Sequence, residues 1–331
     1  MLDASPASAR PPTFRDVLGV RGMTGYYAAA TLARFGDEIA ALAGTTLPMV
    51  SGGFTSMLPS LVPQPLLARA NSLEAASFGA ATVTGPAAAA TIAAAVSVDA
   101  AAVVIAVAAS VSILAILRLP ALPPSLDTTD RQPFFRSVTD GVAHLARTPP
   151  LRASTVTSTA LMGVVGLLLV TLPLHMASLG APKSAAGYVW TAIELGSITT
   201  ALLVGRLRNR WRPEKTVIVA VAAYGLAMTT WTLATSLAVL LVLAAVAGLL
   251  EGPMLPAMFA ARQQYSPNEL QGRVSTTAAS LRVGAAATGQ AVGGLVVPTI
   301  GTPTALLVAA SALIASAALG HISLRPKNLA L

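Results

Sequence analysis

The sequence contains no cysteine, which excludes disulfide bonds, thiolate-bound metals and cysteine nucleophiles. Charged residues make up only 10% of its 331 positions, whereas soluble domains average about 25%. The three histidines (His144, His175 and His321) lie too far apart to share metal-ligand spacing. No Gly-x-x-x-x-Gly-Lys-Ser/Thr loop is present. We therefore expect no metal, no cofactor and no enzymatic activity.

Apolar sequence takes the place of the missing charge, at 54% of all residues. About 20 consecutive apolar residues cross the hydrocarbon core of a bilayer. Runs of this kind cover roughly 23–57, 74–96, 99–118, 153–178, 184–205, 215–236, 237–262, 273–298 and 302–323. The runs are continuous and do not alternate with polar residues, which favours helices over strands. We predict an all-α, multi-pass membrane protein with about nine apolar segments, and the lipid bilayer as its first partner.

The polar stretches divide this chain into parts. Residues 216–250 carry no charge over 35 positions, too many for one ordinary span, so we predict a turn near Ala234–Ser236. Residues 119–152 form the one long polar linker. The expected organisation is a tail at 1–22, a truncated helical half at 23–118, the cytoplasmic linker at 119–152, a six-helix half at 153–323 and a tail at 324–331.

The distribution of Lys and Arg predicts an orientation. Sixteen lie from residue 118 onward, and fourteen of these fall on one side if the spans alternate. Lys183 falls on the other side, and Arg282 lies within a span. Cytoplasmic loops carry this excess of basic residues, so the linker and the C-terminus are expected in the cytoplasm. The net charge of +8 therefore reflects topology, and nucleic acid is not an expected partner.

The chain also repeats part of itself. Residues 63–86 align with residues 267–290 at a constant shift of 204, with identities at Pro63/Pro267, Leu66/Leu270, Arg69/Arg273, Ala75/Ala279, Ala81/Ala285, Thr84/Thr288 and Gly85/Gly289. Each copy is a polar loop with an arginine followed by an apolar helix. A membrane chain built twice from one unit indicates a transporter with its pathway between the halves.

The first copy is the shorter one. From residue 153 to Arg273 the second half has 120 residues, whereas residue 23 to Arg69 covers 46. The difference of about 75 residues amounts to two to three spans. We interpret residues 23–57 as the start of a first helix fused by deletion to the end of a fourth.

These features resemble the major facilitator superfamily of secondary transporters. The segment Gly205-Arg206-Leu207-Arg208-Asn209-Arg210-Trp211-Arg212 is similar to the second-half form of its G-x-L-x-D-R-x-G-R loop, with Asn209 in place of the Asp. Pro63–Gly85 and Pro267–Gly293 resemble the fifth- and eleventh-helix regions of an efflux-type branch that includes siderophore and macrolide exporters. Ala33-Arg34-Phe35-Gly36-Asp37 is similar to first helices of that branch.

Charged residues within apolar spans are the candidate site, because burying charge in lipid is costly and often functional. Glu251, Arg282 and Glu194 lie about 13–16 Å from the cytoplasmic ends of their helices, at 1.5 Å per residue. One hypothesis pairs Glu251 with Arg282 and lets a carboxylate exchange a proton as substrate binds. The alternative is a structural ion pair between two helices. For Glu194, a solvated side chain facing a cavity is the simpler interpretation.

Other candidates have structural alternatives too. Asp37 is a coupling carboxylate in an intact first helix, or part of a solvated turn. Gly205, Arg206, Arg208, Asn209 and Arg210 form either a gating loop or a topology anchor. His175 is a proton switch or a satisfied interfacial histidine. The tryptophans Trp190, Trp211 and Trp231 are more typical of interface anchors than of substrate contacts.

Small residues mark expected helix contacts. The pairs Gly248/Gly252 and Gly289/Gly293, together with Gly85, allow helices to approach closely. Pro253 and Pro256 are expected to break a helix near Glu251. The resemblance implies proton-coupled efflux of a small amphipathic molecule across a bacterial inner membrane. A transport-inactive remnant and a permease subunit of a larger complex remain as alternatives.

Overall fold

The computed structural model of the chain describes residues 13–20, 23–24, 27, 58–59, 61–97, 99–100, 103–104, 106–108, 110, 134–207 and 211–324. Throughout these ranges the regular elements are helical and no strand is present. The all-α prediction is confirmed. The elements are α1 (Phe14–Leu18), η1 (Gln64–Leu66), α4 (Leu67–Ala95), α6 (Phe134–Arg147), α7 (Pro149–Ser178), η2 (Lys183–Ala185), α8 (Ala186–Leu207), α9 (Pro213–Thr229), η3 (Thr230–Leu233), α10 (Leu237–Glu251), α11 (Met254–Tyr265), α12 (Asn268–Ile300) and α13 (Thr302–Ser323).

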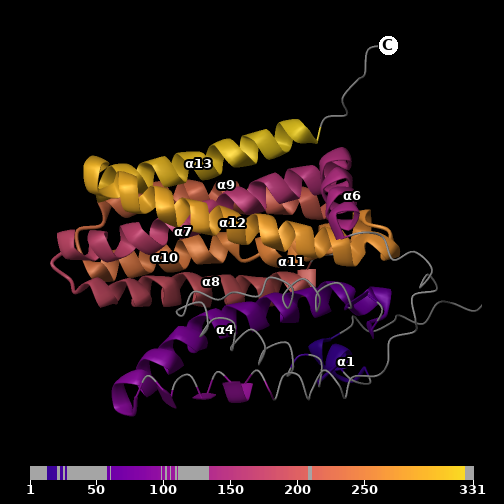
Figure 1. Cartoon of the computed structure of the whole chain (residues 1–331), viewed down its shortest axis with the longest axis horizontal. Coiled ribbons are helices and arrows are strands. Elements are labelled where there is room, and N and C mark those ends of the chain that lie inside the picture. The colour runs from indigo at the N-terminus through magenta and orange to yellow at the C-terminus, as the bar shows by residue number, and fades with distance from the viewer. Residues whose placement is uncertain are drawn as a thin grey trace, which may run out of the picture.

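The long helices lie side by side in a bundle (Figure 1). Helix α7 packs against α12 and α13, α8 packs against α10, and α9 packs against α13 and α10. Helix α4 packs against α8 and α11, so it covers one side of the bundle. The short helix α6 lies across one end, against α12 and α7.

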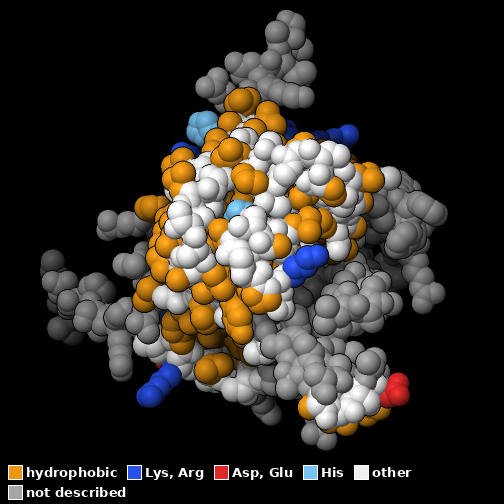
Figure 2. Space-filling view, turned by 90° about the vertical axis from the view of Figure 1, so that its left-hand side faces the viewer, with side chains coloured by type: hydrophobic (Ala, Val, Ile, Leu, Met, Phe, Trp, Pro, Cys, Tyr) orange, Lys and Arg blue, Asp and Glu red, His pale blue; other side chains and the backbone are white. Residues whose placement is uncertain are grey.

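Five helical stretches in the described part of the chain are long and apolar enough to cross a membrane. They are Pro149–Ser178, Pro213–Leu233, Leu237–Tyr265, Glu269–Ile300 and Thr302–Ser323. The bundle end opposite α6 shows mostly apolar and uncharged polar side chains, with few charged groups (Figure 2). Large apolar side chains are exposed on these helices, among them Leu226, Val242 and Leu295, which suits a bundle immersed in lipid.

The predicted turn falls where η3 ends at Leu233 and α10 begins at Leu237. Ser236 caps α10, because its hydroxyl accepts a hydrogen bond from the Val239 amide at 3.4 Å. The expected break beside Glu251 is also present: α10 ends at Glu251, and α11 begins at Met254 after Pro253. Proline has no amide hydrogen, so the helical hydrogen bonding is interrupted there.

The two copies of the repeat begin with the same local turn. Pro63 has φ −55° and ψ 144°, and Pro267 has φ −56° and ψ 150°. In each copy the proline carbonyl accepts an amide three residues on, from Leu66 at 2.9 Å and from Leu270 at 3.0 Å. Long helices follow, α4 in the first copy and α12 in the second. Pro182, which lies outside the repeat, starts η2 with the same turn, so this geometry is a local property of proline at a helix start, and the repeat stays a prediction from the sequence.

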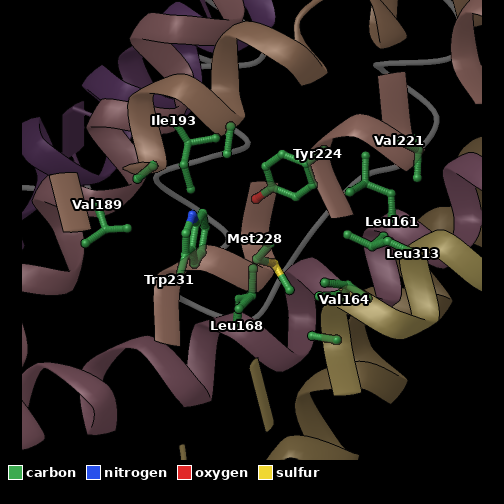
Figure 3. Close-up of a cluster of buried hydrophobic side chains, with 14 of the residues drawn as sticks. Leu161, Val164, Leu168, Val189, Ile193, Val221, Tyr224, Met228, Trp231 and Leu313 are labelled. Carbon is green, nitrogen blue, oxygen red and sulfur yellow. The ribbon is translucent and has the colours of Figure 1, made fainter. Parts of the chain in front are cut away.

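A buried apolar cluster fills the centre of the bundle (Figure 3). Trp231 is fully buried and meets Tyr224 edge to face, with ring centroids 6.2 Å apart. Leu168 and Met228 are buried beside them in the same cluster. The interpretation of Trp231 as an interface anchor was wrong, because η3 folds its ring inward. Trp211, in contrast, is 69% exposed.

Glycines set the closest helix contacts. A Cβ added to Gly289 of α12 would lie 1.9 Å from the Gly163 carbonyl oxygen of α7. A Cβ at Gly248 of α10 would lie 2.0 Å from the Ile193 carbonyl oxygen, and one at Gly252, just after this helix, would lie 2.4 Å from the Ser197 carbonyl oxygen. Such backbone contact needs residues without a side chain. A Cβ at Gly293 would meet Leu167 and Val170 at 3.4 Å, an easier fit. Gly85 lies within α4, and its surroundings are outside the described side chains.

We predict that Gly289→Ala lowers the melting temperature of the purified protein, because overpacking of this kind costs about 1–3 kcal/mol. Gly284→Ala is the matched control on the same helix, since nothing lies within 4 Å of its added Cβ. Thermal unfolding followed by tryptophan fluorescence in one detergent compares the two variants. Equal melting temperatures would contradict the close α7–α12 contact.

Candidate functional site

Glu251, the last residue of α10, is the centre of the candidate site. Its carboxylate accepts a hydrogen bond at 2.8 Å from the Ser197 hydroxyl of α8. A negative charge at the C-terminal end of a helix is opposed by the helix dipole. The site therefore favours partners that supply positive charge or donate hydrogen bonds to this carboxylate.

Arg282 of α12 supplies the positive charge. The charges of Glu251 and Arg282 attract each other. The Nε atom of Arg282 is buried and has no hydrogen-bond partner among the described residues. The direct polar contact of Glu251 is with Ser197. The two predicted residues therefore interact through their charges, without a hydrogen bond between their described side chains.

Glu194 and Tyr224 extend the site across two more helices. Tyr224 of α9 is 2% exposed, and the negative charges of Glu251 and Glu194 both act on its hydroxyl. Glu194 of α8 also reaches towards α4, where a Cβ added to Gly79 would lie 3.0 Å from its carboxylate oxygen. Both glutamates are half-buried. Four helices of the second half, α8, α9, α10 and α12, thus surround one group of polar side chains.

At the end of the bundle near α6, a chain of polar contacts links several helix termini. Arg273 of α12 forms a salt bridge with Asp140 of α6 at 3.5 Å. His144 of α6 contacts the Tyr265 carbonyl oxygen at 3.1 Å. The Tyr265 hydroxyl donates to the Glu214 carboxylate of α9 at 3.0 Å. These contacts hold α6 against the helix ends.

Near the same end, α4 is attached to α11. Asn71 donates its side-chain amide to Gln263 at 2.8 Å, and Gln263 donates back at 3.0 Å. Phe78 and Phe259 pack nearby on these helices, with ring centroids 5.9 Å apart. Asn71 is 1% exposed, so this reciprocal pair is shielded from solvent. It joins the first half of the chain to the second.

Other predicted residues lie elsewhere. Asp37, Arg208, Asn209 and Arg210 are outside the described residues. Gly205 and Arg206 lie in the last turn of α8, where only the backbone is described. His175 lies near the end of α7, where its Nδ1 contacts the Thr302 hydroxyl at 3.1 Å while its buried Nε2 has no hydrogen-bond partner among the described residues. No group of His, Asp and Glu able to hold a metal occurs in the described ranges.

Some residues of the site had no clear sequence signal. Ser197 and Tyr224 are ordinary hydroxyl residues in apolar helices, and Ser197 lies 54 positions before its partner. Arg262 is one of the fourteen basic residues expected on one side of the membrane, and the sequence did not indicate that it is only 5% exposed. Asn71 and Gln263 are 192 positions apart. A search for polar side chains in apolar segments would have found them, without indicating which pairs meet.

The helical bundle, with five stretches long and apolar enough to cross a membrane in its described part, defines a polytopic membrane protein. The sequence profile of the Major Facilitator Superfamily matches residues 155–329. The chain belongs to that superfamily, and the family predicted from the sequence is confirmed.

Two curated relatives show how far the similarity reaches. An uncharacterized MFS-type transporter, y4rN of Sinorhizobium fredii (strain NBRC 101917 / NGR234), is 28% identical over 286 residues, or 84% of this chain and 69% of the relative. The multidrug efflux pump Tap of Mycolicibacterium fortuitum is 27% identical over 165 residues, or 47% of this chain and 38% of the pump. The chain thus spans about two thirds of the first relative's length and less than half of the second's.

Solved structures show the same fold at low identity. The human organic anion transporter MFSD10 (TETRAN) superposes with a TM-score of 0.68 and 15% identity, covering 90% of this chain and 83% of that one. The E. coli fucose:proton symporter FucP superposes with a TM-score of 0.61 and 12% identity, covering 95% of this chain and 86% of that one.

The Asn71–Gln263 contact predicts a specific crosslink. The chain has no native cysteine, so an Asn71→Cys/Gln263→Cys variant carries only the two new thiols. With a protease site inserted at 119–133, a short bis-maleimide is expected to keep the two fragments joined on a denaturing gel. The control pair Asn71→Cys/Ser178→Cys is expected to separate, because Ser178 ends α7 at the opposite end of the bundle. Separation of both pairs would disprove the α4–α11 contact.

Proposed function

We propose that the chain is a proton-coupled exporter of small amphipathic molecules in a bacterial inner membrane. The observation that carries the proposal is the polar group around Glu251, where Ser197, Tyr224 and Arg282 meet from three other helices. Ionisable residues at this depth in a membrane bundle mark substrate and ion pathways. The relative Tap, named as a multidrug efflux pump, supports the outward direction.

Glu251 is the proposed proton carrier. Its ionised form is stabilised by the Ser197 hydroxyl and by the charge of Arg282. Glu194 and Arg262 are the other charged groups of this region. A substrate group that donates to the Glu251 carboxylate stabilises its ionised form and thereby favours release of the proton. Substrate and proton then compete for one carboxylate, which couples outward movement of the substrate to inward movement of the proton.

The two halves supply the movement in this proposal. Transporters of this kind expose a central site to one side of the membrane at a time as one half rocks against the other. The α4–α11 contacts, Asn71 with Gln263 and Phe78 with Phe259, lie towards one end of the bundle. Separating them would open the central site to that end.

The orientation follows from charge in this proposal. Arg147 of α6, Arg152, Arg212 and Arg273 gather where α6 closes the bundle, whereas Lys183 lies beyond the far end of α7. Since cytoplasmic surfaces of membrane proteins carry the excess of Lys and Arg, the α6 end is the cytoplasmic one. The C-terminal end of α13 lies at that end too.

Proteoliposomes test the coupling, with ethidium and carboxyfluorescein as cationic and anionic fluorescent probes. An imposed pH gradient is expected to drive at least one probe, and Glu251→Gln and Arg282→Gln are each expected to reduce this movement about tenfold or more. Those losses should be similar, since each variant removes one member of the same charge pair. Glu269→Gln is the control, because Glu269 is an exposed carboxylate at the start of α12.

The alternatives give other results in the same assay. Dependence on ATP and a partner ATPase would favour a permease subunit. No movement of either probe would contradict the proposal and favour a transport-inactive remnant, especially if restoring the missing helices of the first half created activity. Full gradient-driven activity of Glu251→Gln or Arg282→Gln would remove these residues from the coupling mechanism.

A further inference from the structure

The turn that starts α9 folds its acidic side chain inward. Glu214 follows Pro213, the first residue of the helix, and is 2% exposed. Its carboxylate accepts the hydrogen bond from the Tyr265 hydroxyl at 3.0 Å. Glu214 is also the one acidic residue in the sequence between Glu194 and Glu251. The outer surface of this turn therefore has no acidic side chain of its own.

The outward side chains of the same turn are aromatic or basic. Trp211 is 69% exposed, and the neighbouring Arg212 and Lys215 are exposed too. Neither basic residue forms a salt bridge with another residue in the described ranges. The Arg212 carbonyl oxygen accepts the amides of Lys215 and Thr216 at 3.1 and 3.2 Å, so both basic residues belong to one ordered helix start. The turn thus presents two positive charges and an indole ring to its surroundings.

An apolar stripe continues from this turn along α9. Val219 and Leu226 are exposed, and their spacing from Lys215 places all three on one face of the helix. The opposite face carries Val221 and Tyr224, which are buried in the bundle core. In a membrane the exposed stripe faces the acyl chains of lipids, and its first residue is Lys215.

The length of this stripe matches one leaflet of a bilayer. Lys215 and Leu226 are eleven residues apart, which is about 16 Å along a helix. Half of the hydrocarbon core is about 15 Å thick. An acyl chain that lies along Val219 and Leu226 therefore has its phosphate at the level of Arg212 and Lys215. Tryptophan is enriched at that same headgroup level, where Trp211 would lie.

We propose that Arg212 and Lys215 bind the headgroup phosphate of an anionic phospholipid, whose acyl chain lies along the exposed stripe of α9. Guanidinium and ammonium groups both pair with phosphate. A zwitterionic lipid carries a cation beside its phosphate, which the two basic residues repel, whereas an anionic lipid does not. Each basic residue near an anionic membrane surface strengthens binding about fivefold.

The bound lipid also has a structural consequence. Glu214 stands between the two basic residues in the sequence and holds Tyr265, the last residue of α11. A headgroup on Arg212 and Lys215 therefore keeps the junction of α9 and α11 at the membrane surface. This contact depends on the lipid composition of the leaflet and not on a transported substrate.

Fluorescence of Trp211 tests the site directly. The chain has three tryptophans, so Trp190→Phe/Trp231→Phe leaves Trp211 as the one reporter. This full-length variant is reconstituted in phosphatidylcholine bilayers that contain either brominated phosphatidylglycerol or brominated phosphatidylcholine at equal mole fraction. Bromine quenches tryptophan at short range. The binding constant of phosphatidylglycerol relative to phosphatidylcholine is expected to be about tenfold, because two basic residues contribute.

Variants in the same background identify the residues that bind the lipid. Arg212→Gln/Lys215→Gln is expected to lower the relative binding constant to about one, because both charges are gone. Lys183→Gln is the control, since it removes one exposed basic residue at the far end of α7 and should keep the preference. Equal quenching by the two lipids in the parent, or an unchanged preference in the double variant, would overturn the lipid site.

A second measurement covers the case in which replacement of the buried Trp231 prevents folding. Thermal unfolding is then followed on the chain with all three tryptophans, in mixed micelles of detergent and either lipid. Phosphatidylglycerol is expected to raise the melting temperature more than phosphatidylcholine, because a ligand of the folded state stabilises it. Arg212→Gln/Lys215→Gln should abolish this difference, and an equal melting temperature of the parent in both lipids would contradict the site. Neither measurement involves transport, so the result is independent of the proposed function.

Discussion

Charge buried inside an apolar helix bundle needs an opposite charge or hydrogen-bond donors within reach, and this requirement organises the second half of the chain. The Glu251 carboxylate satisfies it with the Ser197 hydroxyl and the charge of Arg282. The distance to Ser197 depends on helix spacing, which glycines set. Gly248 of α10 and Gly252, which caps its C-terminal end, pack against the backbone of α8 at Ile193 and Ser197. The packing glycines and the polar site therefore form one arrangement, since a side chain at Gly252 would push Ser197 away from Glu251.

Helix α11 connects this site to the rest of the molecule, because several faces of one short helix serve different contacts. Gln263 and Phe259 reach α4 in the first half. Tyr265 contacts α6 and α9, and the positive charge of Arg282 on α12 acts on that of Arg262. The break at Pro253 separates α11 from α10, so the segment that carries these contacts is covalently joined to Glu251 but not part of its helix. A shift of α11 would change the contact between the halves and the charge near the site at the same time.

The sequence predicted those features that depend on local chemistry. The turn before Ser236 and the break at Pro253 follow from an uncharged run too long for one span and from the missing proline amide. Glu251 and Arg282 were visible because charge is rare in apolar segments. No such signal existed for contacts between side chains on different helices. Nothing in the sequence distinguishes Ser197 from other hydroxyl residues, or indicates that Gln263 meets Asn71. The burial of Arg262 had no sequence signal for a related reason: a position near a helix end suggests exposure, and only packing against neighbouring helices buries this side chain.

The two copies of the sequence repeat carry different chemistry. Pro63 and Pro267 start the two copies with matching turns, and the backbones of α4 and α12 continue from them. At the shift of 204, Phe78 of the first copy corresponds to Arg282 of the second. Phe78 packs on Phe259 and holds the halves together, whereas Arg282 acts on Glu251. The same place on the repeated helix thus provides an apolar contact between halves in one copy and a charge at the site in the other. Since lipid penalises each unpaired charge, placing the arginine in only one copy lets a single carboxylate balance it.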